Sequence, residues 1–349
     1  MRQAENANAS DIHLQMQGAS AEVALRLDGV LTPLTTMPHD LAERVMGRIK
    51  FLARLKTYQE LLPQDGRIDK TELHARSDIR VATYPTVTGE KVVLRLFSTR
   101  EASGLNELHL PPAALAALER FLAQTAGLLL LTGPAGSGKT TLIYACLRRL
   151  VSLGGRHIIT VKDPAEQIVP GVMQTEVNEA RGLTFACAAR HLLRQDPQVL
   201  VIGEIRDNET AGIAVRAALT GHLVISTLHA GSCGGVFERL IGLCADLSAV
   251  AASLELIVNQ RLIRKLCPAC AGAGCTTCLE TGYQGRYPLF EWLAIDGAVR
   301  HHIAAREIES IQPQHSLAEA GRAAIQEGLT NTAELIRVLG TINPILESS

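Results

Sequence analysis

The stretch GLLLLTGPAGSGKT, residues 127–140, decides the fold of this 349-residue chain. An apolar run leads into eight residues that fit the pattern G-x4-G-K-[ST], and a helical segment follows over about residues 139–152. Glycines in such a turn let successive backbone N–H groups converge on phosphate oxygens, and the start of the helix adds a favourable dipole. The stretch therefore predicts a strand, a phosphate-binding loop and a helix in direct succession.

Each residue type in this loop has an expected task. Lys139 would contact the β- and γ-phosphates of a nucleoside triphosphate, and the Thr140 hydroxyl would bind Mg²⁺. A glycine-rich turn that fits the pattern by chance is the alternative, and the flanking strand and helix count against it. The expected nucleotide-binding residues are Gly133, Pro134, Gly136, Ser137, Gly138, Lys139, Thr140 and Thr141.

The pattern of the surrounding chain predicts two domains. Apolar runs such as RHIITV, VLVIG and HLVISTLH alternate with helical segments, which indicates an α/β domain with a mainly parallel sheet over residues 113–293. Upstream, short alternating stretches surround one helix at about residues 40–55 and predict a small α+β domain over residues 11–100. We expect residues 1–10 to be a disordered lead, residues 101–112 a linker and residues 294–349 a helical C-terminal part.

Two segments place carboxylates at strand ends. Glu204 follows the run VLVIG, and Asp163 and Glu166 lie in the turn TVKDPAE. Beside a phosphate-binding loop, Glu204 could hold Mg²⁺ through water or orient a nucleophile, and Asp163 and Glu166 could address water and metal. A solvated or capping glutamate and a plain Asp-Pro turn are the respective alternatives.

Two histidines stand at opposite ends of the run HLVISTLH. His222 and His229 could sense phosphate or couple subunits, because imidazole changes its charge near neutral pH. A structural role at a strand end is the alternative for each of them.

The eight cysteines fall into two groups. Clustered thiols in a chain without an export signal indicate metal more often than disulfides, and four thiolates suit one structural Zn²⁺. An empty, reduced loop is the alternative. The clustered residues, Cys267, Cys270, Cys275 and Cys278, form C-x2-C-x4-C-x2-C, whereas Cys146, Cys187, Cys233 and Cys244 are scattered and are expected to be small buried apolar residues.

Composition limits the possible partners and location. The chain has 34 Lys and Arg against 35 Asp and Glu, so no whole-protein field would attract a nucleic acid, and direct nucleic-acid binding is not expected. The longest plainly apolar run is far shorter than the ~20 residues of a membrane helix, so no transmembrane segment is expected. The polar start MRQAENANAS lacks the apolar core of a secretory signal, which predicts a cytoplasmic protein.

Several blocks in order closely resemble the type II secretion and type IV pilus assembly ATPase family. GPAGSGKTT, TVKDPAE, the run ending in VLVIGEIRD, and ALTGHLVISTLH resemble its Walker A motif, Asp box, atypical Walker B motif and His box. ASDIHL, LPQDGRI and VATYPTVTGEKVVLRL resemble its small N-terminal domain, and CPAC with GCTTC resembles its metal-binding insert. The resemblance implies a RecA-like P-loop NTPase domain, carrying the tetracysteine insert at residues 267–278, preceded by a small PAS-like α+β domain.

The same resemblance assigns roles to residues. It makes Glu166 the catalytic carboxylate, Glu204 the second carboxylate, and His222 and His229 the His-box pair. It also matches Arg80 and Arg95 to small-domain arginines that reach the γ-phosphate when the two domains close. Without the resemblance, both arginines read as solvated strand residues.

The chain departs from the family pattern at four places. Lys162 stands where the Asp box usually has Glu, and Gln198 stands where Asp commonly precedes the Walker B run, so a basic and a neutral residue replace two acids expected near the metal. Gly203 replaces the usual Asp at the end of that run. The two C-x2-C pairs are separated by four residues, where the family commonly has a longer loop.

The resemblance implies a hexameric, cytoplasmic motor ATPase that uses ATP and Mg²⁺, carries Zn²⁺, and powers assembly of a pilus or pseudopilus for secretion, pilus biogenesis or DNA uptake. Its implied partners are other copies of the chain and an inner-membrane platform protein, through which it would associate with the inner face of the cytoplasmic membrane. A retraction or conjugative DNA-transfer ATPase is one alternative. A non-hydrolysing, nucleotide-binding structural or regulatory subunit is the alternative from another class, and Lys162 and Gln198 motivate it.

Overall fold

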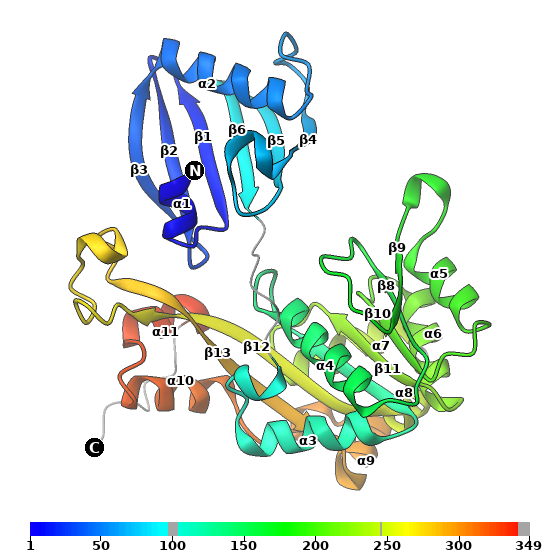
Figure 1. Ribbon diagram of the computed structural model, residues 1–349. Helices are drawn as coiled ribbons and strands as arrows, with labels where there is room; N and C mark the ends of the chain where they lie inside the picture. The colour runs from blue at the N-terminus through cyan, green and yellow to red at the C-terminus, as the bar shows by residue number, and fades with distance from the viewer. Residues whose placement is uncertain (97–103, 245, 341–349) are drawn as a thin grey trace. The chain divides into compact units, whose positions relative to one another are not determined.

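The computed structural model describes residues 1–96, 104–244 and 246–340, and the chain forms two compact units (Figure 1). The first unit comprises Met1–Glu101 with Arg264–Arg286, and the second comprises Ala102–Ile263 with Tyr287–Ser349. The tetracysteine segment therefore groups with the first unit, although we expected it inside the P-loop domain. Part of the expected linker, residues 101–103, lies outside the described residues.

The first unit is built on a six-stranded antiparallel sheet with the order β3-β2-β1-β6-β5-β4. One face of this sheet is apolar because its strands alternate: Ile12, Leu14 and Met16 of one strand are all buried on it. Its elements are α1 (Arg2–Asn6), β1 (Asp11–Gln17), β2 (Ser20–Leu27), β3 (Val30–Pro38), α2 (His39–Leu52), β4 (Gln64–Ile68), the 3₁₀ helix Lys70–Leu73, β5 (Ile79–Thr86) and β6 (Gly89–Leu96).

Helix α2 covers the apolar face of this sheet. Its buried residues Ala42, Met46 and Lys50 recur every four positions, which places them on one side of the helix. The buried Lys50 ammonium lies 2.9 Å from Glu90, so its charge is compensated inside the unit. The expected small α+β domain with a single main helix is therefore present.

The N-terminal lead differs from the expectation of disorder. Residues 2–6 form α1, and the small side chains of Ala4 and Ala9 are buried in the core of the first unit. A polar composition concealed this packing, because two alanines are enough to anchor so short a segment.

The second unit has a seven-stranded, mostly parallel sheet with the order β13-β12-β7-β11-β10-β8-β9. The expected mainly parallel sheet is confirmed, and its P-loop helix α4 runs one residue beyond the expected end. The principal elements are α3 (Pro112–Ala123), β7 (Gly127–Thr132), α4 (Lys139–Leu153), β8 (Ile158–Lys162), β9 (Val172–Glu176), α5 (Phe185–Leu192), β10 (Val199–Ile202), α6 (Asn208–Leu219), β11 (Leu223–Leu228), α7 (Cys233–Leu243), α8 (Leu247–Ser253), β12 (Leu254–Leu266), β13 (Tyr283–Ala294), α9 (Gly297–Ala305), α10 (Leu317–Gln326) and α11 (Thr332–Leu339).

The central strands β7, β8, β10 and β11 are buried on both faces because they are mostly apolar. In β7, Leu128 and Leu130 pack with helices α5 to α9 on one side, whereas Leu129 and Leu131 pack with α3 and α4 on the other. All four leucines are at most 1% exposed. The carboxyl ends of β7, β8, β10 and β11 are left free of these covering helices and carry the loops of the candidate site.

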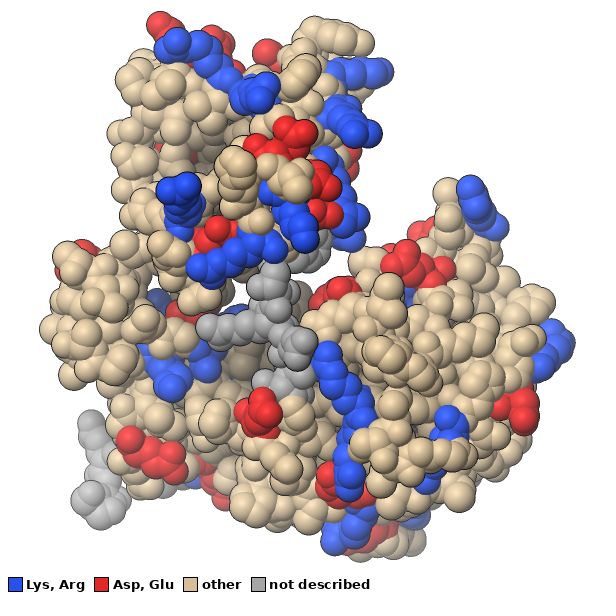
Figure 2. Space-filling model, viewed as in Figure 1, with Lys and Arg blue, Asp and Glu red and all other residues tan. Residues whose placement is uncertain are grey.

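The last described helices close a smaller core. Side chains of α10 and α11 pack on Ile263 of β12 and Leu289 of β13. No helix within the described ranges has both the length and the apolar character needed to cross a bilayer. Figure 2 shows basic side chains lying beside acidic ones on the visible face of each unit, in keeping with the near-zero net charge.

Candidate active site

The loop after β7 has the backbone geometry of a phosphate-binding turn. Gly133, Gly136 and Gly138 all have positive φ angles, of 135°, 74° and 94°. A Cβ at Gly133 would clash with the backbone carbonyl oxygen of Gln260 in β12, whereas a Cβ at Gly138 would lie 2.6 Å from the side-chain amide nitrogen of Gln260. The backbone conformation therefore favours glycine at all three positions, and the close approach of β12 also requires it at Gly133.

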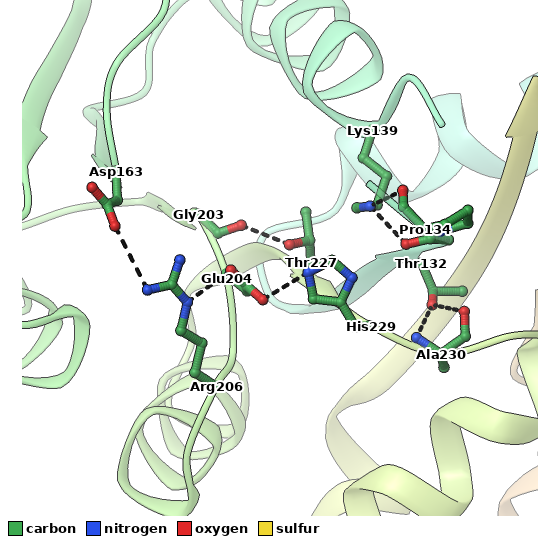
Figure 3. Close-up of polar contacts among 11 residues, drawn as sticks. Thr132, Pro134, Lys139, Asp163, Gly203, Glu204, Arg206, Thr227, His229 and Ala230 are labelled. Atoms are coloured by element: carbon green, nitrogen blue, oxygen red, sulfur yellow. Dashed lines mark hydrogen bonds and ion pairs between the residues drawn. The ribbon is translucent and has the colours of Figure 1, made fainter. Parts of the chain in front are cut away.

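Lys139 folds back onto the loop that carries it. Its ammonium donates hydrogen bonds to the carbonyl oxygens of Gly133, at 2.7 Å, and Pro134, at 2.8 Å (Figure 3). Burial lowers the pKa of Lys139, partly opposed by the charge of Glu204. Phosphate oxygens in the loop would replace the two carbonyls as stronger, charged acceptors.

Several of the predicted site residues line one cavity of about 180 Å³ at the carboxyl edge of the sheet. The P-loop helix α4 forms one wall, and the ends of β8, β10 and β11 form the others. Of the predicted residues, the structure brings together here Lys139, Thr140, Asp163, Glu166, Glu204 and His229. The complete lining is Lys139, Thr140, Ile143, Lys162, Asp163, Pro164, Glu166, Phe185, Gly203, Glu204, Arg206, Thr227 and His229.

Both carboxylate oxygens of Glu204 are engaged. Arg206 donates from Nε to Oε2 at 2.9 Å, and His229 Nε2 lies 2.9 Å from Oε1 (Figure 3). The hydrogen bond to Glu204 raises the pKa of Arg206, which also lies 3.6 Å from Asp163. Glu204 is thus a carboxylate held in a fixed orientation by two side chains.

Glu166 differs from Glu204 in the surroundings of its carboxylate. It lines the same cavity and is exposed, and none of the described residues forms a hydrogen bond or ion pair with its carboxylate. A carboxylate without a fixed partner is the better candidate for accepting a proton from water.

The two predicted histidines lie at opposite ends of β11. His229, just after β11, reaches Glu204 from the neighbouring strand end. His222, just before β11, faces the opposite edge of the sheet, where its ring lies 3.0 Å from the carbonyl oxygen of Ala217. Only His229 lines the cavity, as expected for two residues at opposite ends of one strand.

Gln198 is also remote from the cavity, contrary to the expectation that it replaces an acid near the metal. It precedes β10 at the end opposite Glu204, and its amide oxygen accepts from the backbone N–H of His157 at 2.6 Å. Its role is to join two strand starts. Lys162, by contrast, does line the cavity.

Sequence reasoning missed several wall residues, chiefly Phe185, Arg206 and Thr227. The Arg206 guanidinium lies 5.4 Å from the centre of the Phe185 ring, and the Thr227 hydroxyl donates to the Gly203 carbonyl at 2.8 Å. Arg206 stands two residues after Glu204, a spacing that could have drawn attention to it. Phe185 gave no signal, because its place depends on how α5 packs on the sheet.

Arg80 and Arg95 lie in the first unit as direct cross-strand neighbours. The row that they form extends on both sides: Asp11 pairs with Arg95 and Arg26, and Arg67 pairs with Arg80. Asp11 is buried and accepts from Arg95 Nε at 2.9 Å. Arg67, absent from the sequence expectations although it lies in LPQDGRI, joins Arg80 and Arg95 as a third exposed arginine on the same face.

The four clustered cysteines form a compact thiol site. Their ligand atoms all lie within 4.8 Å of one another, and three sulfur pairs are 3.8 or 3.9 Å apart. Sulfurs bound ~2.3 Å from one tetrahedral Zn²⁺ would be separated by about 3.8 Å, so the donor set fits this ion. Desolvation raises the pKa of Cys278, but N–H groups of Cys275 and Gly282 outweigh it and lower that pKa to about 6.

The scattered cysteines only partly follow expectation. Cys146 and Cys233 are buried, whereas Cys187 and Cys244 are half-buried. Burial raises the pKa of Cys146 to about 12, which suits a small apolar residue inside α4.

Comparison with known proteins gives a consistent relationship. The chain is 39% identical to the type II secretion system protein HxcR of Pseudomonas aeruginosa, covering 97% of this chain and 75% of the relative. It is 36% identical to the type IV pilus assembly ATPase PilB of Thermus thermophilus, covering 96% of this chain and 42% of the relative. The crystal structure of the pilus retraction motor PilT with bound ADP matches the fold with a TM-score of 0.69 at 26% identity, covering 98% of this chain and 96% of that one.

A match to a family sequence pattern extends this relationship over almost the whole chain. Residues 1–337 match the family described as type II/IV secretion system protein. The P-loop, the strand-end carboxylates and both sheets lie within that range. The chain therefore belongs to the type II/IV secretion system protein family.

Proposed function

We propose that this chain is a motor ATPase that hydrolyses ATP to drive assembly of a pilus or pseudopilus fibre. It works as a homohexamer on the cytoplasmic side of the membrane and acts on an inner-membrane platform protein. The observation that carries the proposal is one cavity lined by Lys139, Thr140, Glu166, Glu204 and His229. A phosphate-binding loop facing two carboxylates is the arrangement that triphosphate hydrolysis requires.

Each residue of the cavity has its own role in binding or hydrolysis. The loop N–H groups and Lys139 hold the phosphates, and the Thr140 hydroxyl and Glu204 hold Mg²⁺, which when bound neutralises phosphate charge. Glu166 accepts a proton from the attacking water, because its carboxylate is exposed in the cavity and lacks a fixed partner. His229 and Arg206 keep the Glu204 carboxylate oriented toward the cavity.

Arginines of the first unit complete the site in the closed state. Arg80 and Arg95 contact the γ-phosphate, and their planar, permanently charged groups suit that task. Arg95 exchanges its bond to Asp11 for phosphate when the nucleotide is bound. Differential contact with the γ-phosphate then couples hydrolysis to a change in domain arrangement.

The relatives support the process assigned here. One is named as a type II secretion protein and another as a pilus assembly ATPase, and the retraction motor was crystallised with ADP. The tetracysteine site holds one structural Zn²⁺, because four thiolates leave no coordination position for reacting water. Retraction or conjugative DNA transfer is the competing process, and a non-hydrolysing subunit is the competing class.

Phosphate release by the purified chain tests hydrolysis. Lys139→Ala should lose both nucleotide binding and turnover, whereas Glu166→Gln should bind ATP normally and turn over at least ~10²-fold more slowly. Glu238→Gln, an exposed glutamate on α7, is the matched control and should behave as the wild type. Wild-type turnover in Glu166→Gln together with loss in Glu204→Gln would exchange the two carboxylate roles. A wild-type chain that binds ATP without releasing phosphate would support the non-hydrolysing subunit instead.

A further inference from the structure

A second lysine lines the nucleotide cavity. Lys162 is the last residue of β8, and its side chain reaches the cavity although the residue is only 5% exposed. Burying an ammonium is costly unless a partner compensates its charge. The position of Lys162 therefore calls for an explanation.

The partner of Lys162 in this structure is an aromatic ring. Its ammonium lies 3.7 Å from the centre of the Tyr144 ring, and among the described residues it forms no hydrogen bond or ion pair. A cation–π contact of this kind compensates only part of the desolvation. Accordingly, burial lowers the pKa of Lys162 to about 8, although the charge of Glu166 acts in the opposite direction. An anion in the cavity would supply the missing compensation.

The fold places this ammonium near the phosphates. Tyr144 lies four residues after Thr140 on α4, so the two side chains share one face of the helix about 6 Å apart. Lys139 and Thr140 at the start of α4 are the residues proposed to hold the β- and γ-phosphates. Lys162 approaches from β8, which lies on the far side of β10 and β11 from the P-loop strand. It lines the same cavity of about 180 Å³ as Lys139 and Thr140, so an anion bound there has cationic groups on both sides.

We propose that Lys162 contacts the terminal phosphate of ATP, so that the P-loop unit itself supplies a group that distinguishes ATP from ADP, in addition to the arginines of the first unit. The proposal rests on the proposed function, because it requires ATP in this cavity. Tyr144 is the positioning residue: its ring holds the ammonium at the cavity wall, and its hydroxyl, which accepts from the Gln167 N–H at 3.0 Å, fixes the ring to the loop after β8. ADP lacks the group that Lys162 contacts, so its binding is nearly independent of this lysine.

Two other roles for Lys162 make different predictions. A lysine that only filled space would affect neither nucleotide when replaced by a side chain of similar length. A lysine that acted through Glu166 would affect turnover and leave both affinities unchanged. The ratio of ATP to ADP affinity therefore separates the proposed role from both.

Lys162→Met is the variant of choice because it keeps the length and apolar stem of the side chain. Calorimetric titration with ATPγS and with ADP measures the two affinities without turnover. A charge-assisted hydrogen bond corresponds to about 10- to 100-fold in affinity, so we expect ATPγS to bind that much more weakly and ADP to change less than about twofold. Lys162→Gln should show the same selective loss. Arg120→Met, an exposed cation on α3, is the control and should leave both affinities unchanged.

Each remaining outcome has a definite meaning. An unchanged ATPγS affinity in both variants would overturn the proposal, even if hydrolysis fell. Equal weakening of ATPγS and ADP would overturn it as well, because the lysine would then support the loop in general. A wild-type chain that bound neither nucleotide would instead contradict the proposed function itself.

Discussion

Gly203 is the residue where a single methyl group should reveal how tightly the cavity wall is packed. It follows β10 immediately before Glu204. A Cβ at this position would lie 3.1 Å from the Val161 carbonyl oxygen, 3.1 Å from the Phe185 ring and 3.3 Å from Lys162 Cα. Two of these three neighbours are backbone atoms of β8, which is paired with β10 on one side and β9 on the other.

The expected cost of Gly203→Ala follows from these contacts. Overpacking of this kind lowers the free energy of unfolding by ~1–3 kcal/mol. Alanine also has fewer backbone conformations than glycine in the unfolded chain, which raises the free energy of unfolding by ~0.4–1 kcal/mol. We therefore expect a net loss of about 1–2 kcal/mol. The Phe185 ring is the neighbour best able to move. Its movement would displace Arg206 from Glu204, so hydrolysis should fall together with stability.

Urea unfolding followed by tryptophan fluorescence measures the effect in the relevant unit. Trp292 is the single tryptophan and lies buried in β13 of the second unit. With an m-value typical of urea unfolding, the urea concentration at the midpoint of unfolding should fall by about 0.3–1 M. Gly242→Ala in α7 is the control, because no atom lies within 4 Å of its Cβ, and it should leave the midpoint unchanged or raise it. A Gly203→Ala midpoint equal to or above that of the wild type would refute this account of the wall.

Two further predictions concern the first unit. Protein purified without added metal should contain about one zinc per chain by elemental analysis. The variant Cys275→Ser should lose this zinc and unfold at a lower temperature. A metal-free chain with normal thermal stability would contradict the structural role of the zinc. Arg80→Ala and Arg95→Ala should each lower hydrolysis by ~10³-fold or more while ADP affinity stays nearly constant, with Arg120→Ala as the control. Near-wild-type hydrolysis in the double variant would show that neither arginine contributes to hydrolysis.

The sequence determined those features whose physics is local. The loop from Gly133 to Thr140 needs only its own glycines, lysine and threonine to form a phosphate-binding turn, so its pattern and the flanking elements were sufficient. The same holds for the four clustered cysteines, whose spacing brings their sulfurs together within one short loop. The continuously apolar runs predicted a parallel sheet covered on both faces, because that burial leaves no polar alternation along the strand.

Only the tertiary structure decided which strand ends meet. The sheet order inserts β11 between β7 and β10, and this brings His229 to Glu204 while it leaves His222 at the far edge. Strand register, which no local pattern states, aligned Arg67, Arg80 and Arg95 in one row. Close packing against β8 explains why glycine stands before Glu204. These outcomes depend on contacts between residues far apart in the chain, and such pairings are fixed by the collective packing of both faces of a sheet.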